Sequence, residues 1–366
     1  MKAQAASRFF EVRQRLLREK LEARGLPFLV VTNPPNVFYL TGFRGSAGVV
    51  VSGPSGALLL VDPRYTIQAA EQAHGVGVKE VTTGLFHAAG RRLQKLRARR
   101  IGFEDSHLTV AEFHRFRNEG PPDAKWKAAG GLIEDLRVVK DDLEIEQIRA
   151  ACRLTSEAFE EVLPQACPGV LERDLASELD FRMRRKGADG AAFETIVASG
   201  LRGALPHARP SVKPLKAGEL VIFDLGAILG GYAADMTRTV YLGVPGKRVR
   251  FLYQAVLEAE QAAIGALHPG MRAGEADSAA RRWLAAKKLD KLFTHSTGHG
   301  VGVEIHERPR LGRGEKTPLP ARSVVTVEPG IYIKGFGGIR IEDTALVGPA
   351  GVEILTPAAK DRWWVE

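Results

Sequence analysis

Four acidic residues stand in stretches of sequence that are otherwise apolar. Asp224 lies in ELVIFDLGA and Asp235 in GGYAADMTRTV, while Glu328 lies in VVTVEPGIYI and Glu342 in GGIRIEDTALV. β-Branched neighbours indicate strands with buried faces. Burying an unpaired carboxylate costs several kcal/mol or forces it to stay protonated, so each of these side chains requires a partner.

Asp224 and Asp235 form a first pair. They are 11 positions apart, and Gly230 with Gly231 between them predicts a turn that joins two strands. A hairpin of this kind would bring the two carboxylates together. A single aspartate is more often a turn or strand-end residue, but two in this setting favour a functional site.

Three histidines, His295, His299 and His306, follow in the segment THSTGHGVGVEIHE. Glycines on both sides of His299 remove side-chain bulk and allow close approach of backbone and imidazole. No glutamate follows His299, which excludes the HExxH pattern of a zinc peptidase helix. A single histidine is more often structural, whereas three within twelve positions indicate a site.

Arg340 stands two positions before Glu342, and both lie in an expected strand, Ile339–Val347. Alternation along that strand places the Arg340 and Glu342 side chains on one face and Asp343 on the other. A structural ion pair between Arg340 and Glu342 is therefore the alternative to a functional role for this glutamate.

The charge of the candidate ligands favours a dinuclear metal centre. Four carboxylates and one imidazole carry a charge of −4 when ionised, which two divalent cations balance and one does not. Oxygen-rich ligation with one nitrogen and no sulfur suits Mn²⁺, Co²⁺ or Zn²⁺. Two such ions can hold a bridging hydroxide and polarise a carbonyl, which is metal-assisted hydrolysis. The candidate ligands are Asp224, Asp235, His299, Glu328 and Glu342.

The segments around these residues predict two domains, since 366 residues fit about two domains of roughly 150 residues each. The first third alternates helices with strands, which predicts an α/β domain at 1–135. Its helices are expected at Ser7–Arg24 and Leu85–Arg97, and its strands at Phe28–Val31, Gly48–Val51, Ala57–Val61, Val78–Val81 and Arg100–Phe103.

Residues 136–366 are expected to form an α+β domain, with helices gathered against a largely antiparallel sheet. Acidic residues between Asp141 and Glu146 suit the N-terminus of a helix that runs to Leu163, because they complement its dipole. Further helices are expected at Glu172–Lys186, Val249–Leu267 and Glu275–Lys288, and strands within Phe193–Leu242 and at Ser323–Val327, Ile331–Ile333, Ile339–Val347 and Val352–Leu355.

Composition and charge exclude several classes of protein. Only two cysteines are present, so a disulfide framework is excluded and a reducing, cytoplasmic location is expected. No apolar run reaches the length of a membrane span. The net charge of +9 is densest at Arg91–Arg100, which lacks aromatic residues and favours a solvated helix face over a nucleic-acid-binding surface. We therefore expect neither nucleic acid nor a membrane as a partner.

Five motifs together resemble a known enzyme family. SGLRGALPH, FDLGAILGGYAADMTRT, TGHGVGVEIHE, TVEPGIYI and GGIRIEDT occur in the order typical of the pita-bread metallopeptidases, which include Xaa-Pro aminopeptidases, Xaa-Pro dipeptidases (prolidases) and methionine aminopeptidases. The resemblance covers about residues 141–355. NPPNVFYLTGFRGSAG and VDPRYTIQA are similar to the creatinase-type N-terminal domain, which methionine aminopeptidases usually lack.

The resemblance implies that the five candidate ligands hold two metal ions, with Mn²⁺ preferred over Co²⁺ and Zn²⁺. Asp235 and Glu342 would bridge the ions. Glu328 would also take the proton of the attacking water, which makes it a catalytic residue as well as a ligand.

Four further residues have roles that the resemblance implies. His207, in ALPH, and His306 would hydrogen-bond the substrate from opposite sides of the scissile bond, which is oxyanion-type stabilisation and makes both catalytic. His295 would line the proline-side pocket. Arg340 would orient the substrate or hold Glu342.

These expectations lead to a primary hypothesis, a cytoplasmic dinuclear exopeptidase that removes the first residue of peptides beginning Xaa-Pro. The compact length and the string ASGLRGALPH favour the aminopeptidase type. The close alternative is an Xaa-Pro dipeptidase, which acts only on dipeptides. A methionyl-type aminopeptidase and a non-catalytic module that binds peptide or nucleic acid are less favoured. The family often dimerises, so a homodimer is expected.

Overall fold

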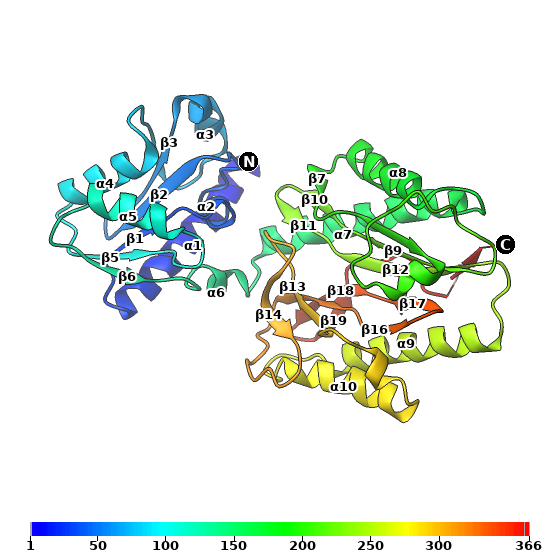
Figure 1. Cartoon of the computed structure of the whole chain (residues 1–366). Coiled ribbons are helices and arrows are strands. Elements are labelled where there is room, and N and C mark those ends of the chain that lie inside the picture. The colour runs from blue at the N-terminus through cyan, green and yellow to red at the C-terminus, as the bar shows by residue number, and fades with distance from the viewer. Residues whose placement is uncertain (1, 362, 366) are drawn as a thin grey trace. The chain divides into compact units, whose positions relative to one another are not determined.

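The chain divides into two compact units, Met1–Arg137 and Val138–Glu366, in a computed structural model that describes residues 2–361 and 363–365. Each unit has its own sheets and its own buried apolar core (Figure 1). No helix among the described residues is long and apolar enough to cross a membrane.

The N-terminal unit is built on a six-stranded mixed sheet in the order β4-β3-β2-β1-β5-β6. The central strand β1 pairs antiparallel with β2 and parallel with β5. The α/β class predicted for this part of the chain is confirmed. The strands are β1 (Phe28–Val31), β2 (Gly48–Gly53), β3 (Gly56–Val61), β4 (Gly77–Glu80), β5 (Arg100–Phe103) and β6 (Lys125–Ala128).

Several helices of this unit were not expected from the sequence. α2 begins with two prolines, and proline is well suited to the first turn of a helix. α5 begins at a capping box in which Thr109 and Glu112 bond each other's backbone. The helices are α1 (Lys2–Ala23), α2 (Pro34–Thr41), α3 (Thr66–Gln72), α4 (Leu85–Lys95), α5 (Val110–Glu119) and α6 (Glu134–Arg137), with a 3₁₀ turn η1 (Pro63–Tyr65).

The second unit contains a four-stranded sheet, β20-β12-β9-β8, and a five-stranded sheet, β14-β13-β15-β18-β19. Two smaller sheets, β11-β10-β7 and β16-β17, complete it. The strands are β7 (Gly190–Ala191), β8 (Ile196–Ser199), β9 (Leu220–Leu225), β10 (Ala227–Leu229), β11 (Tyr232–Ala233), β12 (Met236–Leu242), β13 (Gly298–Gly300), β14 (Glu307–Leu311), β15 (Ser323–Val327), β16 (Gly330–Ile333), β17 (Gly337–Arg340), β18 (Asp343–Gly348), β19 (Gly351–Ile354) and β20 (Trp364–Val365).

Helices cover the strands of this unit from two sides (Figure 1). α7 and α8 pack on the four-stranded sheet, and α9 and α10 pack on the opposite side against the five-stranded sheet. The acidic start expected for α7 is present as a capping box between Asp141 and Glu144. The helices are α7 (Asp142–Val162), α8 (Glu172–Arg185), α9 (Lys247–Ala266) and α10 (Gly274–Ala286), with 3₁₀ turns η2 (Leu163–Gln165), η3 (Gly200–Ala204) and η4 (Asp290–Leu292).

The predicted α+β class of the second unit is confirmed, but one expected strand is wrong. Ile339–Val347 was expected to be continuous, whereas the structure ends β17 at Arg340 and begins β18 at Asp343. β17 pairs with β16, and β18 pairs with β15. The chain therefore changes sheets at Ile341 and Glu342, so simple alternation does not relate the Arg340 and Glu342 side chains.

Candidate active site

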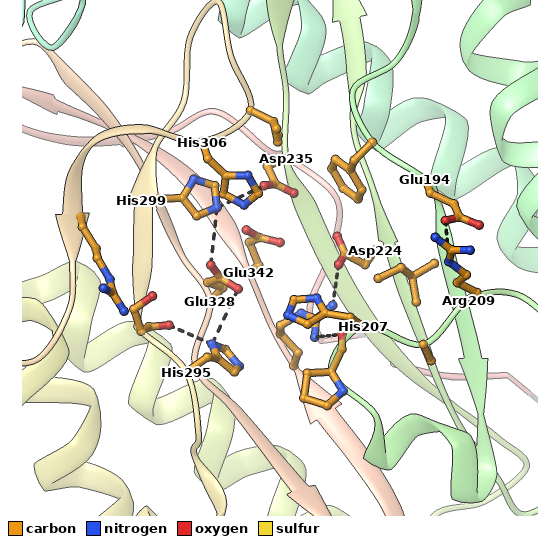
Figure 2. Close-up of a pocket in the computed structure, with 18 of the residues that line it drawn as sticks. Glu194, His207, Arg209, Asp224, Asp235, His295, His299, His306, Glu328 and Glu342 are labelled. Carbon is orange, nitrogen blue, oxygen red and sulfur yellow. Dashed lines mark hydrogen bonds and ion pairs between the residues drawn. The ribbon is translucent and has the colours of Figure 1, made fainter. Parts of the chain in front are cut away.

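A cavity of about 680 Å³ in the second unit brings together all nine residues singled out from the sequence (Figure 2). Strands from both larger sheets and the η3 loop supply its walls. The nine residues are His207, Asp224, Asp235, His295, His299, His306, Glu328, Arg340 and Glu342.

The two aspartates reach the cavity from neighbouring antiparallel strands. Asp224 lies in β9 and pairs in register with Thr237 of β12, and Asp235 stands immediately before β12. The connection passes through Gly230 and Gly231, whose φ angles of 61° and 83° favour glycine. The turn expected between the aspartates is therefore present, and it returns the chain so that both lie on the cavity wall.

His299 is the central residue of β13, and its glycine neighbours allow the adjoining strands to approach. A Cβ on Gly298 would lie 1.9 Å from the Thr326 carbonyl oxygen, and one on Gly300 would lie 2.2 Å from that of Arg308. Neither position accepts a side chain without moving backbone. The glycine pattern seen in the sequence thus has a direct steric reason.

Carboxylates and imidazole converge within the cavity. His299 Nε2 lies 3.6 Å from Asp235 Oδ2 and 3.6 Å from Glu328 Oε1. One donor atom each from Asp235, His299 and Glu342 lie within 4.8 Å of one another, an arrangement that can hold a metal ion. Glu328 enters at the end of β15 and Glu342 between β17 and β18, so four separate segments meet here.

Burial and mutual repulsion set the ionisation of this cluster. Burial, followed by the charge of Glu342, raises the pKa of Asp235 well above its ordinary value, and burial raises that of Glu328 similarly. Burial and the charge of Asp224 raise the pKa of Glu342 to about 8. These carboxyl groups stay protonated because too little positive charge lies near them. Divalent cations can replace the protons, so the cluster is suited to bind them.

Arg340 is the cation at the edge of the cluster, and its guanidinium is nearly fully buried. Its Nη2 donates to Asp224 Oδ2 at 2.5 Å, and its Nη1 donates to the carbonyl oxygen of Pro206 at 3.1 Å. Among the described residues, Arg340 forms no ion pair with Glu342, which was the structural alternative. Its ion-pair partner is Asp224. Through Pro206, Arg340 also holds the loop that carries His207.

His295 is a neutral imidazole, and both of its ring nitrogens are hydrogen-bonded. Nδ1 lies 2.8 Å from the Ser296 carbonyl oxygen and must donate to it, which leaves Nε2 to accept from the Tyr332 hydroxyl at 2.9 Å. Arg340 donates to the same hydroxyl at 2.7 Å. Burial lowers the pKa of His295 to about 4. The ring therefore faces the cavity as an uncharged wall.

Tyr332 is a residue that the sequence analysis missed. It lies in TVEPGIYI, a motif noted only for its glutamate. A buried tyrosine needs a partner for its hydroxyl, and this rule alone could have marked it as a candidate.

His306 and His207 stand at different parts of the cavity wall (Figure 2). The His306 ring lies beside His299, with 4.3 Å between ring centroids, and burial lowers the pKa of His306. His207 follows η3 on the side of Asp224. Farther along the rim, Arg209 pairs with Glu194 at 3.1 Å, a pair that the sequence did not indicate.

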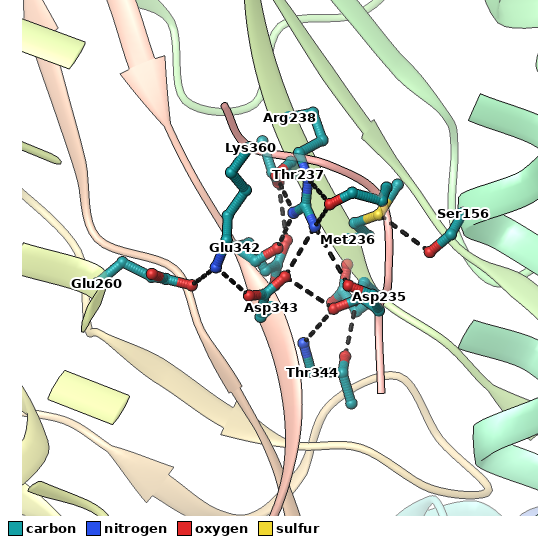
Figure 3. Close-up of polar contacts among 12 residues, drawn as sticks. Ser156, Asp235, Met236, Thr237, Arg238, Glu260, Glu342, Asp343, Thr344 and Lys360 are labelled. Carbon is teal, nitrogen blue, oxygen red and sulfur yellow. Dashed lines mark hydrogen bonds and ion pairs between the residues drawn. The ribbon is translucent and has the colours of Figure 1, made fainter. Parts of the chain in front are cut away.

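A buried network lies directly behind Glu342 and Asp235 (Figure 3). Thr237 Oγ1 donates to Glu342 Oε2 at 2.7 Å, and Thr344 Oγ1 donates to the Asp235 carbonyl oxygen at 2.8 Å. Arg238 donates to the Glu342 carbonyl oxygen at 2.5 Å. These bonds hold the Glu342 carboxylate and the backbone carbonyl groups of Asp235 and Glu342 in place.

Asp343 continues this network away from the cavity. It pairs with Arg238 at 2.8 Å and with Lys360, which in turn contacts Glu260 at 2.7 Å. Arg238, Asp343 and Glu260 are almost completely buried, so the network is shielded from solvent.

The fold and the cavity define a metallopeptidase, and comparison of the sequence with known families agrees. Residues 146–349 match the family described as metallopeptidase family M24, and residues 13–139 match the creatinase/prolidase N-terminal domain. The chain belongs to metallopeptidase family M24. The resemblance seen in the sequence is thereby confirmed.

Several of its relatives match over nearly the full length of both chains. The Xaa-Pro dipeptidase of Pyrococcus horikoshii is 34% identical over 94% of this chain and 96% of that protein. The structure of an Xaa-Pro dipeptidase from Bacillus anthracis superposes with a TM-score of 0.94 at 36% identity, covering 97% of this chain and 100% of that one. That of an X-Pro aminopeptidase from Thermotoga maritima gives 0.88 at 35% identity, covering 93% and 98%.

Proposed function

We propose that this chain is a metal-dependent exopeptidase that cleaves the bond between an N-terminal residue and a following proline. The observation that carries the proposal is the convergence of donor atoms from Asp235, His299 and Glu342 in a cavity that is also lined by His207 and His306. The relatives named as Xaa-Pro peptidases support the choice of substrate bond.

Two divalent cations, with Mn²⁺ preferred and Co²⁺ or Zn²⁺ as alternatives, are the cofactor that the donor set fits. Bound divalent cations lower the pKa of water and polarise a carbonyl oxygen. Asp235 and Glu342 would supply carboxylate ligands to these ions. The residues that would hold them are Asp224, Asp235, His299, Glu328 and Glu342.

Glu328 is the proposed base. Its carboxylate borders His299, and its backbone N–H donates to the Thr297 carbonyl oxygen at 2.7 Å, which fixes the residue at the end of β15. From this position the carboxylate is suited to accept the proton of the attacking water and to pass it to the leaving nitrogen.

The histidines have two proposed roles. Some stabilise negative charge on the substrate, and one shapes the pocket. His207 and His306 stand at different parts of the wall and are proposed to donate hydrogen bonds to the carbonyl oxygen as it becomes negative. His295 has both nitrogens engaged, so its role is to present an uncharged ring to the proline. Arg340 orients Asp224 and the His207 loop.

We favour the aminopeptidase type, in which the peptide continues beyond proline. The lining residues His295, Ser296 and Arg310 also border a second cavity, so the wall on the proposed proline side leads to further space. The second candidate is an Xaa-Pro dipeptidase, and the names of several relatives favour it at least as well. A cytoplasmic location and a homodimer stay predictions.

Hydrolysis of Ala-Pro, Ala-Pro-Ala and Ala-Ala-Ala, followed by mass spectrometry, tests the proposal. The protein is stripped of metal and then given Mn²⁺, Co²⁺ or Zn²⁺, with Glu328→Gln as the inactive control. We expect metal-dependent release of alanine from both proline peptides. Cleavage of Ala-Pro alone would select the dipeptidase, and cleavage of none would overturn the proposed substrate class.

A further inference from the structure

A second cavity of about 480 Å³ adjoins the candidate active site. It lies between η4 with the segment that follows it and the turn that follows β14. His295, Ser296 and Arg310 line both cavities, so these residues form the boundary between the two spaces.

The floor of the second cavity is held rigidly. Arg281 donates two hydrogen bonds to Asp277 of the same helix and donates to the carbonyl oxygens of Phe293 and His295. Its guanidinium lies 4.2 Å from the centroid of the Phe293 ring, which meets the His295 ring edge-on. Because Asp277 neutralises the charge of Arg281, this arginine has a structural role at the second cavity. Binding of a charged ligand there would depend on other residues.

Three other cations border the cavity, namely Lys291, Arg310 and Arg313. All three are exposed, and no ion pair joins them to any residue that the structure describes. The lining carboxylates are Asp290 and Glu315. The Glu315 carboxylate accepts two hydrogen bonds from Thr317 and also interacts with the charge of Arg310, which leaves Lys291 and Arg313 as the cations for a ligand. Apart from Arg281, the lining thus carries three positive and two negative charges, so its net charge is positive.

From this geometry we infer that the second cavity binds the residue that follows proline and that its cations pair with the free carboxylate of a tripeptide. The inference rests on the proposed function, since it takes His295 as the proline-side wall. A peptide that continues past the His295 ring enters the second cavity, where its C-terminal carboxylate forms ion pairs with Lys291 and Arg313. The site selects tripeptides with a free C-terminus over amidated ones.

The test compares kcat/KM for Ala-Pro-Ala and for Ala-Pro-Ala-amide in the Mn²⁺-loaded full chain. We expect the free acid to be preferred about five- to tenfold, the range of one charge-assisted contact at a solvated site. The double variant Lys291→Glu with Arg313→Glu should reverse that preference. Lys334→Glu changes an exposed lysine outside both cavities and should keep the wild-type ratio.

Two results would overturn the inference: equal kcat/KM for acid and amide in the wild type, or the same ratio in the double variant. Failure of the proposed function looks different, because neither Ala-Pro nor Ala-Pro-Ala would then be cleaved with any metal. In that case calorimetric titration of the two tripeptides into the Mn²⁺-loaded protein still decides, and equal Kd values would reject the site.

Discussion

Thr237 shows how one hydroxyl serves two charged neighbours in the candidate site. It accepts a hydrogen bond from Arg340 Nε at 3.1 Å and donates to Glu342 Oε2 at 2.7 Å. One oxygen of Glu342 is thereby oriented, and a carboxylate oxygen of Glu342 lies within 4.8 Å of donor atoms of Asp235 and His299. Glu342 is for this reason the ligand whose removal should have the clearest effect.

Glu342→Ala is expected to lose bound metal and essentially all turnover, because it removes a carboxylate proposed to be shared by two ions. Metal content after dialysis, measured by elemental mass spectrometry, and hydrolysis of Ala-Pro-Ala check this. Near-normal activity with near-normal metal content in the variant would contradict the dinuclear assignment.

His207→Ala should keep its metal but lose a factor of roughly 10² to 10³ in kcat, the size of a hydrogen bond to a developing oxyanion. The physical reason is that His207 lies on the wall of the cavity but outside the cluster around His299. His268→Ala, an exposed histidine outside the cavity, is the control and should change neither quantity. Loss of metal from His207→Ala would place this residue among the ligands.

At the scale of elements, a buried ion pair ties the segment before α7 to the start of β14. Lys140 Nζ lies 3.0 Å from Glu307 Oε2, and the two side chains are 0% and 4% exposed. Glu307 follows His306 directly, and its other oxygen accepts from the Glu304 backbone N–H at 3.0 Å. The pair therefore holds the loop that presents His306 to the cavity.

Lys140→Met should lower stability by about 3 kcal/mol, because it leaves the buried Glu307 carboxylate without the lysine cation that pairs with it. It should also reduce kcat by roughly 10- to 100-fold through displacement of His306, while metal content stays unchanged. Denaturant unfolding and steady-state kinetics measure the two effects, with exposed Lys216→Met as the control. Lower stability with unchanged kcat would show that the pair does not position His306.

The C-terminal segment is joined to α9 and β18 through Glu260, Lys360 and Asp343 (Figure 3). Burial and the negative charge of Asp343 raise the pKa of Glu260 from 4.5 to about 8. The folded chain thus binds a proton that the unfolded chain has already released between these pH values. Stability from this group is complete below pH 4.5 and is lost as the pH rises through about 8.

Glu260→Gln should remove this pH dependence, because an amide does not titrate and still fits the network. Between pH 5 and 8 the free energy of unfolding of the wild type should fall relative to the variant, by an amount on the order of a few kcal/mol. Urea denaturation at several pH values measures the difference. Parallel pH profiles for the two proteins would show that Glu260 is ionised in the folded state throughout.

At the scale of the whole molecule, metal binding should couple to the stability of the unit that contains the cavity. A ligand that binds only the folded state at 100 times its Kd contributes about 2.7 kcal/mol, equivalent to a Tm increase of roughly 5 to 10 °C. Scanning calorimetry with and without Mn²⁺ should show this increase, and a chelator should reverse it. An equal increase in Glu342→Ala would place the stabilising ion elsewhere.

The class of the chemistry and most of the elements around the candidate site could be predicted from the sequence. Asp224 and Asp235 could be recognised because a carboxylate in an apolar strand lowers the stability of the fold unless it has a partner. His299 could be recognised because the glycines beside it allow other groups to approach its imidazole closely. Strand alternation, the acidic start of α7 and the turn at Gly230 are local properties, and they follow from residues close together in the chain.

Tertiary structure alone decided which groups meet across long separations. The partner of Arg340 is Asp224 instead of nearby Glu342, because the chain changes sheets after β17 and strand parity no longer applies. Tyr332 reaches His295, and Lys140 reaches Glu307 across 167 positions of sequence. Such contacts depend on how two sheets are placed against each other, and that placement is set by packing of the whole core, which no local pattern of residues encodes.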